Sequence, residues 1–227
     1  MRKRRQHVEP ALVVGVAGGS GSGKSTLARR LCERLGPAAV FLTQDVYYHD
    51  VDAALFTPRV WNYDHPEALD LHLFARHVQA LRDHQAADIP AYDFGLYQRT
   101  GETRRVEPAP VIVLEGTLLL AQACLRELLD VRVYVDAPDD VRFIRRLRRD
   151  ILERGRDVET VTEQYMTWNR PMHARFVAPS REFAHIVVPG GGWNTRALEA
   201  LLGMIRLLRP ALELLPAGPE TMEGEAT

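Results

Sequence analysis

Residues 15–26 read Gly-Val-Ala-Gly-Gly-Ser-Gly-Ser-Gly-Lys-Ser-Thr, and this segment is the most informative part of the chain. Its part from Gly18 to Ser25 matches the phosphate-binding pattern G-x-x-x-x-G-K-[ST]. An apolar run precedes it and an amphipathic run follows it, which is the strand–loop–helix context that the pattern requires. Glycines let backbone N–H groups turn toward an anion, and the following helix adds the positive end of its dipole. The stretch therefore predicts a loop that holds nucleotide phosphates.

A flexible Gly/Ser linker is the alternative interpretation, but a linker gives no reason for Lys-Ser at this offset. Only two of the 29 basic residues are lysines, Lys3 and Lys24. A compact ammonium fits under a phosphate chain where a planar guanidinium does not. A lysine at position 24, in a chain that otherwise uses arginine, therefore supports a phosphate-binding loop. We expect Lys24 to contact the β- and γ-phosphates and Ser25 to hold Mg²⁺. The other predicted nucleotide-binding residues of the loop are Gly18, Gly19, Ser20, Gly21, Ser22, Gly23 and Thr26.

The composition is that of a globular protein with almost no net charge. The 227 residues carry a formal net charge of −1, which disfavours general nucleic-acid binding. No apolar run reaches the ~18 residues that a membrane span needs. Residues 1–7 are basic but have no apolar region behind them, so we expect no secretory signal and a cytoplasmic protein. Cys32 and Cys124 form no paired motif, and we expect both in the core of a protein from a reducing compartment.

Short apolar runs alternate with longer amphipathic ones along the chain. The alternation predicts an α/β, three-layer fold with a parallel sheet, in which ligands bind at the carboxyl ends of the strands. We expect a single domain over 8–210, a basic arm over 1–7, and a helix end with a disordered tail over 211–227. The expected strands are 11–17, 39–44, 111–115, 131–136 and 185–189, and the expected helices are 24–35, 66–84, 117–129, 139–154, 158–176 and 194–215, with antiparallel pieces within 89–107.

Acidic residues follow three of the predicted strands, at Asp45, Glu115 and Asp136. A carboxylate at the end of a buried strand beside a phosphate loop suits a Mg²⁺ partner or a base for an attacking hydroxyl. A helix N-cap or a turn residue is the structural alternative. Asp136 fits that alternative because residues 137–139 begin the next predicted helix, whereas Asp45 and Glu115 fit it less well.

Seven arginines lie between residues 142 and 156. A solvated charged face and a nucleic-acid patch are alternatives. Like charges repel one another unless an anion meets them, so we favour a lid that closes over a triphosphate and turns near residues 153–156. Helical spacing predicts an apolar face of Phe143, Ile144, Leu147 and Ile151, and an opposite face of Arg142, Arg145, Arg146 and Arg149.

Several separated motifs together resemble the uridine–cytidine kinase family of P-loop kinases over residues 12–207. Besides the loop, they include Gln44-Asp45-Val46-Tyr47-Tyr48, Asn62-Tyr63-Asp64-His65-Pro66, Pro90-Ala91-Tyr92-Asp93-Phe94, Leu114-Glu115-Gly116 and the segments 149–157, 179–181 and 187–191. The resemblance implies transfer of the γ-phosphoryl group of ATP, or GTP, to the 5′-hydroxyl of uridine or cytidine in pyrimidine salvage. It also implies a β-hairpin insertion that binds the nucleoside, and a homotetramer with feedback inhibition by pyrimidine triphosphates.

The resemblance assigns roles to individual residues. Asp45 falls on the general base, and we expect Lys24 and Arg149 to join it as catalytic residues. Asp64 falls on the carboxylate that holds the ribose hydroxyls, which suits a group that accepts from both. Ser25 and Glu115 fall on the Mg²⁺ site. The lid that contacts phosphates contains Arg146, Arg149 and Arg156, and the nucleoside pocket contains Asp45, Tyr48, Asp64, Tyr92, Phe94, Tyr97, Arg154 and Gln164.

Two aspects of the pocket stay open. Tyr92 and Phe94 also suit an ordinary hydrophobic core. Tyr97 stands where the family usually carries a histidine that faces the pyrimidine edge. A phenol oxygen can accept a hydrogen bond from the amino group of cytosine, and we hypothesise that Tyr97 favours cytidine over uridine.

Other functions of a phosphate loop fit the same residues less well. A GTPase switch needs Asn-Lys-x-Asp, which a chain with lysines only at positions 3 and 24 does not contain. A kinase for another small acceptor shares the fold, but Asp64 with the aromatic pair suits a ribose and a flat base better. A regulatory protein with an inactive site would not need Lys24, Ser25, Asp45 and Glu115 together.

Overall fold

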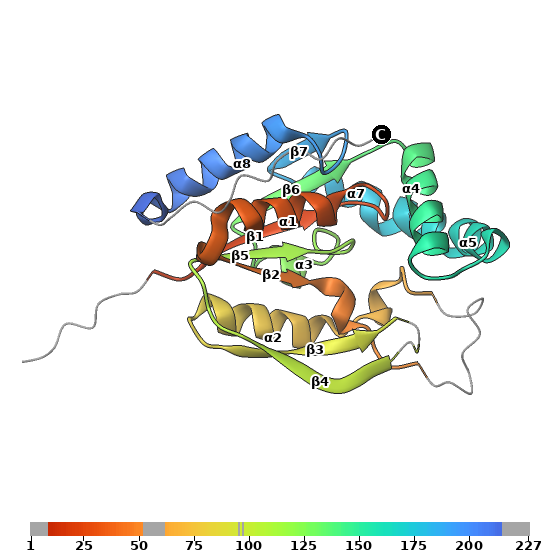
Figure 1. Cartoon of the computed structure of the whole chain (residues 1–227), viewed down its shortest axis with the longest axis horizontal. Helices are drawn as coiled ribbons and strands as arrows, with labels where there is room; N and C mark the ends of the chain where they lie inside the picture. The colour runs from red at the N-terminus through yellow and green to blue at the C-terminus, as the bar shows by residue number, and fades with distance from the viewer. Residues whose placement is uncertain (1–8, 52–61, 95, 97, 215–227) are drawn as a thin grey trace, which may run out of the picture.

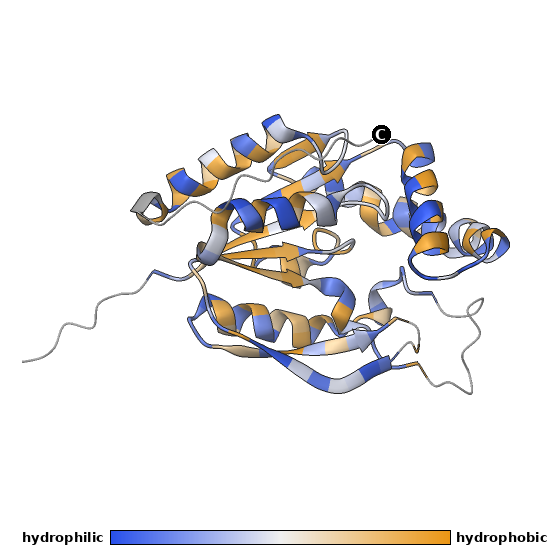
Figure 2. Ribbon diagram, in the orientation of Figure 1, coloured by the Kyte–Doolittle hydropathy of each residue, from blue (hydrophilic) through white to orange (hydrophobic). Residues whose placement is uncertain are grey.

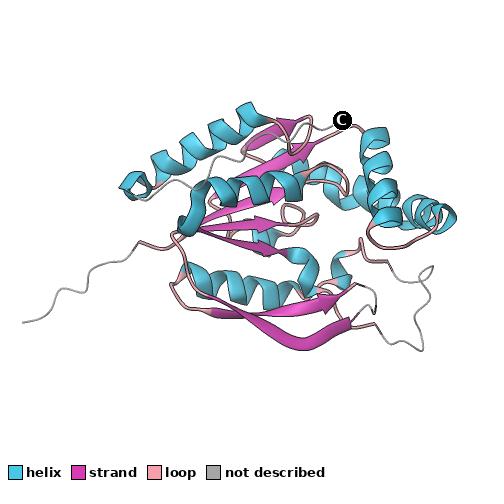
Figure 3. Ribbon diagram, in the orientation of Figure 1, coloured by secondary structure: helices cyan, strands magenta, loops and turns pink. Residues whose placement is uncertain are grey.

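The computed structural model describes residues 9–51, 62–94, 96 and 98–214. The predictions for the basic arm 1–7, for Tyr97 and for the tail from residue 215 onward lie outside these described residues. The parts that are described form a parallel sheet with helices on both faces and a separate β-hairpin (Figure 1, Figure 3). The predicted α/β architecture is therefore confirmed.

Five parallel strands form the central sheet in the order β2-β5-β1-β6-β7. All five strands were predicted from the apolar runs. Their register brings β1, β2 and β5 level, because Leu12 and Ala39 both pair with Val111. The three strands consequently end at the same edge of the sheet. The bounds are β1 Leu12–Ala17, β2 Ala39–Thr43, β5 Val111–Glu115, β6 Val131–Asp136 and β7 Ile186–Pro189.

Consecutive strand residues pack into two different cores, which is why the strands are mostly apolar (Figure 2). Val13 belongs to the cluster formed with Phe74 and the rest of α2, Leu71–Arg82. Val14 belongs to the cluster formed with α1, Lys24–Leu35, and α8, Thr195–Leu208. Figure 1 shows α1 and α8 on one side of the sheet and α2 on the other, so the three predicted layers are present.

The β-hairpin lies beside α2, outside the central sheet (Figure 1). It consists of β3, Ala87–Asp93, paired antiparallel with β4, Gln98–Val106, as the sequence predicted. Arg99 of β4 anchors it by donating to the carbonyl oxygens of Tyr48 at 3.1 Å and Tyr47 at 3.2 Å. The hairpin is thereby held against the segment that follows β2.

The remaining helices follow the sheet in chain order. α4 spans Asp139–Leu152, and α5, Val158–Gln164, continues through two π-helical turns, Tyr165–Asn169 and His173–Val177. The short pieces α6, Arg170–Met172, and α7, Ala178–Ser180, complete this irregular helical segment, which is longer than the predicted 158–176. Within the described residues, no helix is both long and apolar enough to cross a membrane.

Three predicted helices are much shorter in the structure, and α4 ends at Leu152 instead of at the predicted residue 154. Only α3, Ala123–Arg126, forms within 117–129, because Leu118, Leu119 and Leu120 are all buried and cannot lie on one helical face. The segment 66–84 begins with a single 3₁₀ turn, and α2 starts only after its N-cap Asp70. The last predicted helix breaks before Pro210, which cannot continue the hydrogen-bonding pattern.

The cysteine prediction was half wrong, since Cys124 is exposed. Cys32 is only partly exposed, and burial, with a smaller contribution from Glu33, raises the pKa of its thiol to about 12. Cys32 is therefore an unreactive packing residue.

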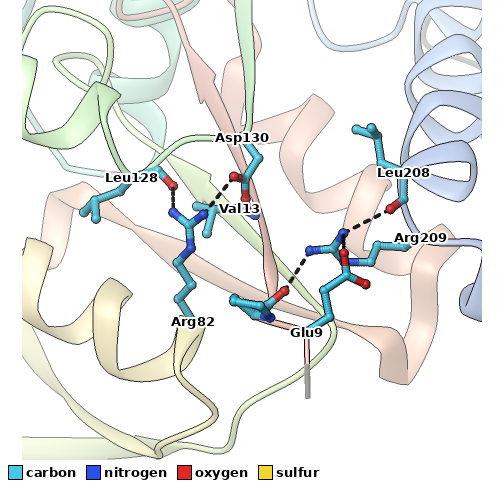
Figure 4. A network of polar contacts seen from close by, with 8 residues as sticks. Glu9, Val13, Arg82, Leu128, Asp130, Leu208 and Arg209 are labelled. Atoms are coloured by element: carbon cyan, nitrogen blue, oxygen red, sulfur yellow. Dashed lines mark hydrogen bonds and ion pairs between the residues drawn. The ribbon is translucent and has the colours of Figure 1, made fainter. Parts of the chain in front are cut away.

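The edge of the sheet where the strands begin is tied together by polar contacts (Figure 4). Arg82 at the end of α2 donates to the Leu128 carbonyl and to Asp130, and Asp130 accepts from the Val13 N–H at 2.8 Å. Arg209 pairs with Glu9 at 2.8 Å. These contacts fix the edge opposite the strand ends and leave the other edge for ligands.

Candidate active site

The carboxyl ends of β1, β2 and β5 bring the predicted phosphate loop, Asp45 and Glu115 to one edge of the sheet. The loop itself depends on glycine. Gly21 and Gly23 have φ values of 78° and 92°, in the left-handed region that residues with a Cβ avoid. Gly23 is also the N-cap of α1, so the loop leads directly into the positive end of that helix.

Lys24 is buried at the first position of α1 and points to the end of β5. Its Nζ lies 3.3 Å from Oε1 of Glu115, which is 2% exposed. The hydroxyl of Thr43 donates to the other carboxylate oxygen at 3.0 Å, and the same hydroxyl accepts from the Asp45 N–H at 3.3 Å. Thr43, which the sequence did not single out, thus connects the two acidic residues at the strand ends.

The residues predicted for Mg²⁺ are of the right chemical kind. Mg²⁺ prefers oxygen ligands and is usually held by one or two protein groups together with waters and phosphates. Ser25 offers a hydroxyl next to Lys24, and Oε1 of Glu115, which faces the Lys24 ammonium, accepts no well-formed hydrogen bond from the described residues. No group of three or more His, Cys, Asp or Glu residues in the described chain could hold a metal alone. This donor set fits Mg²⁺ bound together with a nucleotide.

A single cavity joins the phosphate loop to the residues predicted for the acceptor. Tyr63, Thr117 and Trp168 also line it, although the sequence reasoning did not assign them. Tyr92 does not line the cavity. The predicted site residues on its wall are Ser20, Lys24, Asp45, Tyr48, Asp64, Phe94, Arg146, Arg149, Arg154, Arg156 and Gln164.

Aromatic rings form one side of the cavity. The ring of Tyr48 lies 5.3 Å from that of Tyr63 and 5.6 Å from that of Tyr92. Tyr92 is buried behind Tyr48 and Phe94, so its position agrees with the core alternative, whereas Phe94 is 38% exposed. The guanidinium of Arg154 lies 5.5 Å from the Phe94 ring centre. Such a wall can hold a flat, polar ring by stacking.

The phenol of Tyr48 stays protonated in this setting. Burial raises its pKa well above the usual value, and the charges of Asp45 and Asp64 raise it further. Arg154 and Arg146 lower the pKa, but by less. Tyr48 is therefore a hydrogen-bonding group beside the two carboxylates and not an acid.

Asp64 is oriented by a residue that the sequence reasoning missed. Asn169, which is 3% exposed, donates from Nδ2 to Oδ1 of Asp64 at 2.9 Å. The Asp64 N–H donates to Oδ1 of Asn62 at 3.1 Å, which fixes the turn that carries it. The side-chain oxygen of Asn169 is buried without a hydrogen-bond partner among the described residues. A buried amide with one fixed partner has little freedom, so it holds the Asp64 carboxylate in one orientation.

The predicted division of α4 into an apolar face and an arginine face is wrong at two positions. Arg142 is buried at 3% exposure, where it pairs with Asp139 at 2.5 Å and donates to Nδ1 of His173 at 3.4 Å. Ile144 is 54% exposed instead. Arg142 also lies against the phosphate loop, because a Cβ at Gly19 would collide with its guanidinium. The helix therefore packs on the loop through an arginine.

Four of the six remaining arginines of the segment meet an anion within the chain. Asp150 is fully buried and lies within 4.0 Å of four guanidinium groups, and Arg149 is the nearest at 2.7 Å. Burial raises the pKa of the Asp150 carboxyl, but Arg149, Arg146 and Arg154 lower it more, and the net shift is downward. Asp150 is consequently ionised. From the sequence we expected a bound triphosphate to be the anion that the arginines meet, and the role of Asp150 was not predicted.

Comparison with known proteins agrees with the motif-based prediction. Residues 13–196 match the model of the phosphoribulokinase / uridine kinase family. The chain belongs to this family. A uridine kinase from Listeria monocytogenes serotype 4a (strain HCC23) is 46% identical over 192 residues, which cover 84% of this chain and 92% of that protein. A uridine kinase from Chloroflexus aurantiacus (strain ATCC 29366 / DSM 635 / J-10-fl) is 43% identical over 196 residues, covering 86% and 94%.

Solved structures in this fold have diverged further in sequence. Phosphoribulokinase from Rhodobacter spheroides superposes with a TM-score of 0.60 at 14% identity, over 80% of this chain and 70% of that one. D-glycerate 3-kinase from Cryptococcus neoformans var. grubii gives a TM-score of 0.53 at 19% identity, over 74% and 79%. At such identities the likeness shows the P-loop kinase fold alone.

Proposed function

We propose that this member of the phosphoribulokinase / uridine kinase family transfers the γ-phosphoryl group of ATP to the 5′-hydroxyl of uridine and cytidine. The observation that carries the proposal is the single cavity that contains Lys24 of the phosphate loop together with Asp45 and Asp64. A nucleotide switch or hydrolase has no need for a second, aromatic-walled compartment beside the phosphates. The relatives named uridine kinase support the same assignment.

In this mechanism Asp45 accepts the proton of the 5′-hydroxyl as its oxygen attacks the γ-phosphorus. Lys24 and Arg149 stabilise the charge that develops on the phosphoryl oxygens. When bound, Mg²⁺ neutralises phosphate charge, and Ser25 and Glu115 would hold it. Movement of Lys24 from Glu115 to the phosphates would free that carboxylate for the metal. Arg146 and Arg156 exclude water from the donor phosphates.

The acceptor is held by the opposite wall. The Asp64 carboxylate accepts hydrogen bonds from the 2′- and 3′-hydroxyls of a ribose, which favours ribonucleosides. The pyrimidine packs against Phe94 and Tyr48, and Tyr92 supports both rings from behind. Arg154 and Gln164 offer polar groups at the same wall.

ADP release measured by a coupled assay, with and without each nucleoside, tests the proposal. Turnover should rise by at least about 100-fold when uridine or cytidine is added, because an oriented acceptor replaces water. A basal rate that no nucleoside changes would refute the assignment. A response to another small acceptor would instead favour a different kinase of the same fold, and replacing ATP by GTP would identify the donor.

Asp45→Ala isolates the proposed base. We expect kcat to fall by roughly 10²–10⁴ while the affinity for ATP stays nearly unchanged, because general base catalysis contributes only to the chemical step. Asp140→Ala, an exposed acid in the first turn of α4, is the matched control and should retain kcat. Equal kcat for Asp45→Ala and the wild-type protein would remove Asp45 from the mechanism.

The cytidine preference is a finer proposal that depends on Tyr97 alone. The ratio of kcat/KM for cytidine to that for uridine should be above one in the wild-type protein and should fall in Tyr97→His. The same ratio in both proteins would contradict the idea. A homotetramer and feedback inhibition by pyrimidine triphosphates remain predictions from the resemblance, and a cytoplasmic location remains a prediction from the sequence pattern.

A further inference from the structure

Asp150 is a fully buried carboxylate to which the proposed mechanism gives no role. It is 0% exposed, and all its charged neighbours are arginines. Arg149 donates from Nε at 2.9 Å, and Arg154 and Arg156 each lie 3.4 Å away. Arg146 lies at 3.7 Å. We call Asp150 with Arg146, Arg149, Arg154 and Arg156 the Asp150 cluster.

The four arginines of the cluster lie between the Asp150 carboxylate and the cavity. Each of them lines the cavity that contains Lys24 and Asp45, whereas Asp150 does not. The carboxylate thus stands behind the arginines and the ligand space lies in front of them. Whatever Asp150 does to a ligand, it does through these guanidinium groups.

Local backbone structure builds this arrangement from a short length of chain. Arg146, Arg149 and Asp150 lie in the last turns of α4, which ends at Leu152. Gly155 then adopts a φ of 63°, in the left-handed region, and the chain turns back. The Arg156 N–H donates to the carbonyl oxygen of Asp150 at 3.0 Å and closes the turn. This turn brings Arg154 and Arg156 to the carboxylate of a residue that precedes them on the helix.

We propose that Asp150 is a positioning residue that pre-arranges the four arginines for the donor phosphates by acting as their internal counter-ion. One carboxylate cannot neutralise four guanidinium groups, so the cluster keeps an excess of positive charge facing the cavity. That excess attracts a polyphosphate, while the shared carboxylate prevents the arginines from repelling one another apart before the ligand arrives. The inference deepens the proposed function and rests on it.

The proposal makes a distinctive prediction for Asp150→Asn. Loss of the charge removes the carboxylate that the four close cations share, so a small external anion should take its place. Sodium sulfate, compared with sodium chloride at equal ionic strength, should raise the thermal midpoint of Asp150→Asn by about 2–4 °C or more beyond its effect on the wild-type protein. A carboxylate needed only for packing would give the same sulfate effect in both proteins.

Kinetics supply a second readout. In chloride, Asp150→Asn should lower kcat/KM for ATP by at least about tenfold, because the arginines no longer face the phosphates in one arrangement. Asp140→Asn makes the same chemical change on the exposed first turn of α4 and should match the wild-type protein in both experiments. Asp150→Glu keeps the charge and should retain the wild-type response to sulfate.

Each outcome decides the matter. Equal sulfate shifts in wild type and Asp150→Asn, or a sulfate response of Asp150→Glu that equals that of Asp150→Asn, would overturn the proposal. An Asp150→Asn protein that is unfolded in sulfate as well as in chloride would also overturn it, whereas folding rescued by sulfate supports it. The melting experiments need no turnover, so an enzyme that ignores every nucleoside would refute the proposed function without touching this result.

Discussion

The phosphate loop and the acceptor wall face the same cavity, but they are built from different lengths of chain. The loop collects its groups within residues 18–26, and a loop of this pattern holds phosphates mainly through backbone N–H groups. The acceptor wall gathers single side chains from distant segments, among them Asp45, Asp64, Phe94 and Gln164. Substitutions should therefore harm the loop through backbone strain and the wall through the loss of individual contacts.

Gly21→Ala should break the loop side and give the largest effect. Gly21 has a φ of 78°, and a Cβ there would collide with the backbone carbonyl of Arg142. We expect kcat/KM for ATP to fall by at least about 100-fold, with KM for uridine changed less than about twofold. Gly203→Ala, in α8 with open space at its Cβ, is the matched control and should raise stability by about 0.5–1 kcal/mol. Comparable losses for both substrates would show that the two sides are not separable.

Asp64→Ala should impair binding of the nucleoside and leave binding of ATP intact, which is the reverse of the effect of Gly21→Ala. Loss of hydrogen bonds to a charged group costs about 1.5–3 kcal/mol, so KM for uridine should rise roughly 10–100-fold. KM for ATP should stay unchanged. The preference for uridine over 2′-deoxyuridine should shrink in parallel, and an unchanged preference would show that Asp64 does not contact the ribose.

Asn169→Ala should also affect only the acceptor side, and its effect on KM for uridine should be smaller than that of Asp64→Ala. It removes the hydrogen bond that orients Asp64 but leaves the carboxylate, so KM for uridine should rise by about two- to tenfold. Met166→Ala, an exposed residue of the same π-helical turn, serves as the control. Lower stability with an unchanged KM would give Asn169 a purely structural role.

Asp70→Ala should have the smallest effect and should leave both substrates alone. Asp70 caps α2 by accepting from the Leu73 N–H at 2.9 Å, and loss of a cap costs about 0.5–2 kcal/mol near pH 7. Burial raises its pKa, but the Leu73 N–H and Arg99 lower it more, so the net shift is downward. The ionised form consequently stabilises the protein above about pH 4, and this contribution is lost as pH falls through the folded-state pKa.

Denaturation at several pH values checks the sign. The difference in unfolding free energy between wild type and Asp70→Ala should shrink below about pH 4. Asn194→Ala removes the uncharged cap of α8, where Asn194 accepts from the Ala197 N–H at 3.0 Å. Its effect should not vary over the same pH range. A pH-independent effect of Asp70→Ala would contradict the role of its charge.

The sheet and the loop could be predicted because their signals are local. Buried parallel strands need continuous apolar runs, and a phosphate loop needs glycines at fixed offsets. Residues 117–129 were mispredicted because an apolar run buried on all sides looks like a helix when only its composition is considered. Leu118 illustrates the difference, since its N–H donates to the side chain of Gln44 and not to a helical carbonyl.

The residues that orient or neutralise the side chains of the site were the hardest to predict. Asp150 and Asn169 resemble ordinary polar residues of surface helices in the sequence, and only the tertiary structure buries them beside charged groups. Arg142 was assigned to the arginine face opposite the apolar face because periodicity counts polarity, whereas the phosphate loop packs against that side of α4. Helical spacing gives the face of the helix on which a side chain lies, but not which part of the protein packs against that face.

The anchor of the β-hairpin bears on how such a protein can change its substrate. Arg99 binds main-chain carbonyl oxygens at positions 47 and 48, and every amino acid carries the same oxygen. These two hydrogen bonds therefore do not depend on the side chain at position 48, which faces the cavity. Evolution can exchange that side chain, and with it the preferred acceptor, by single substitutions without first finding a new way to hold the hairpin.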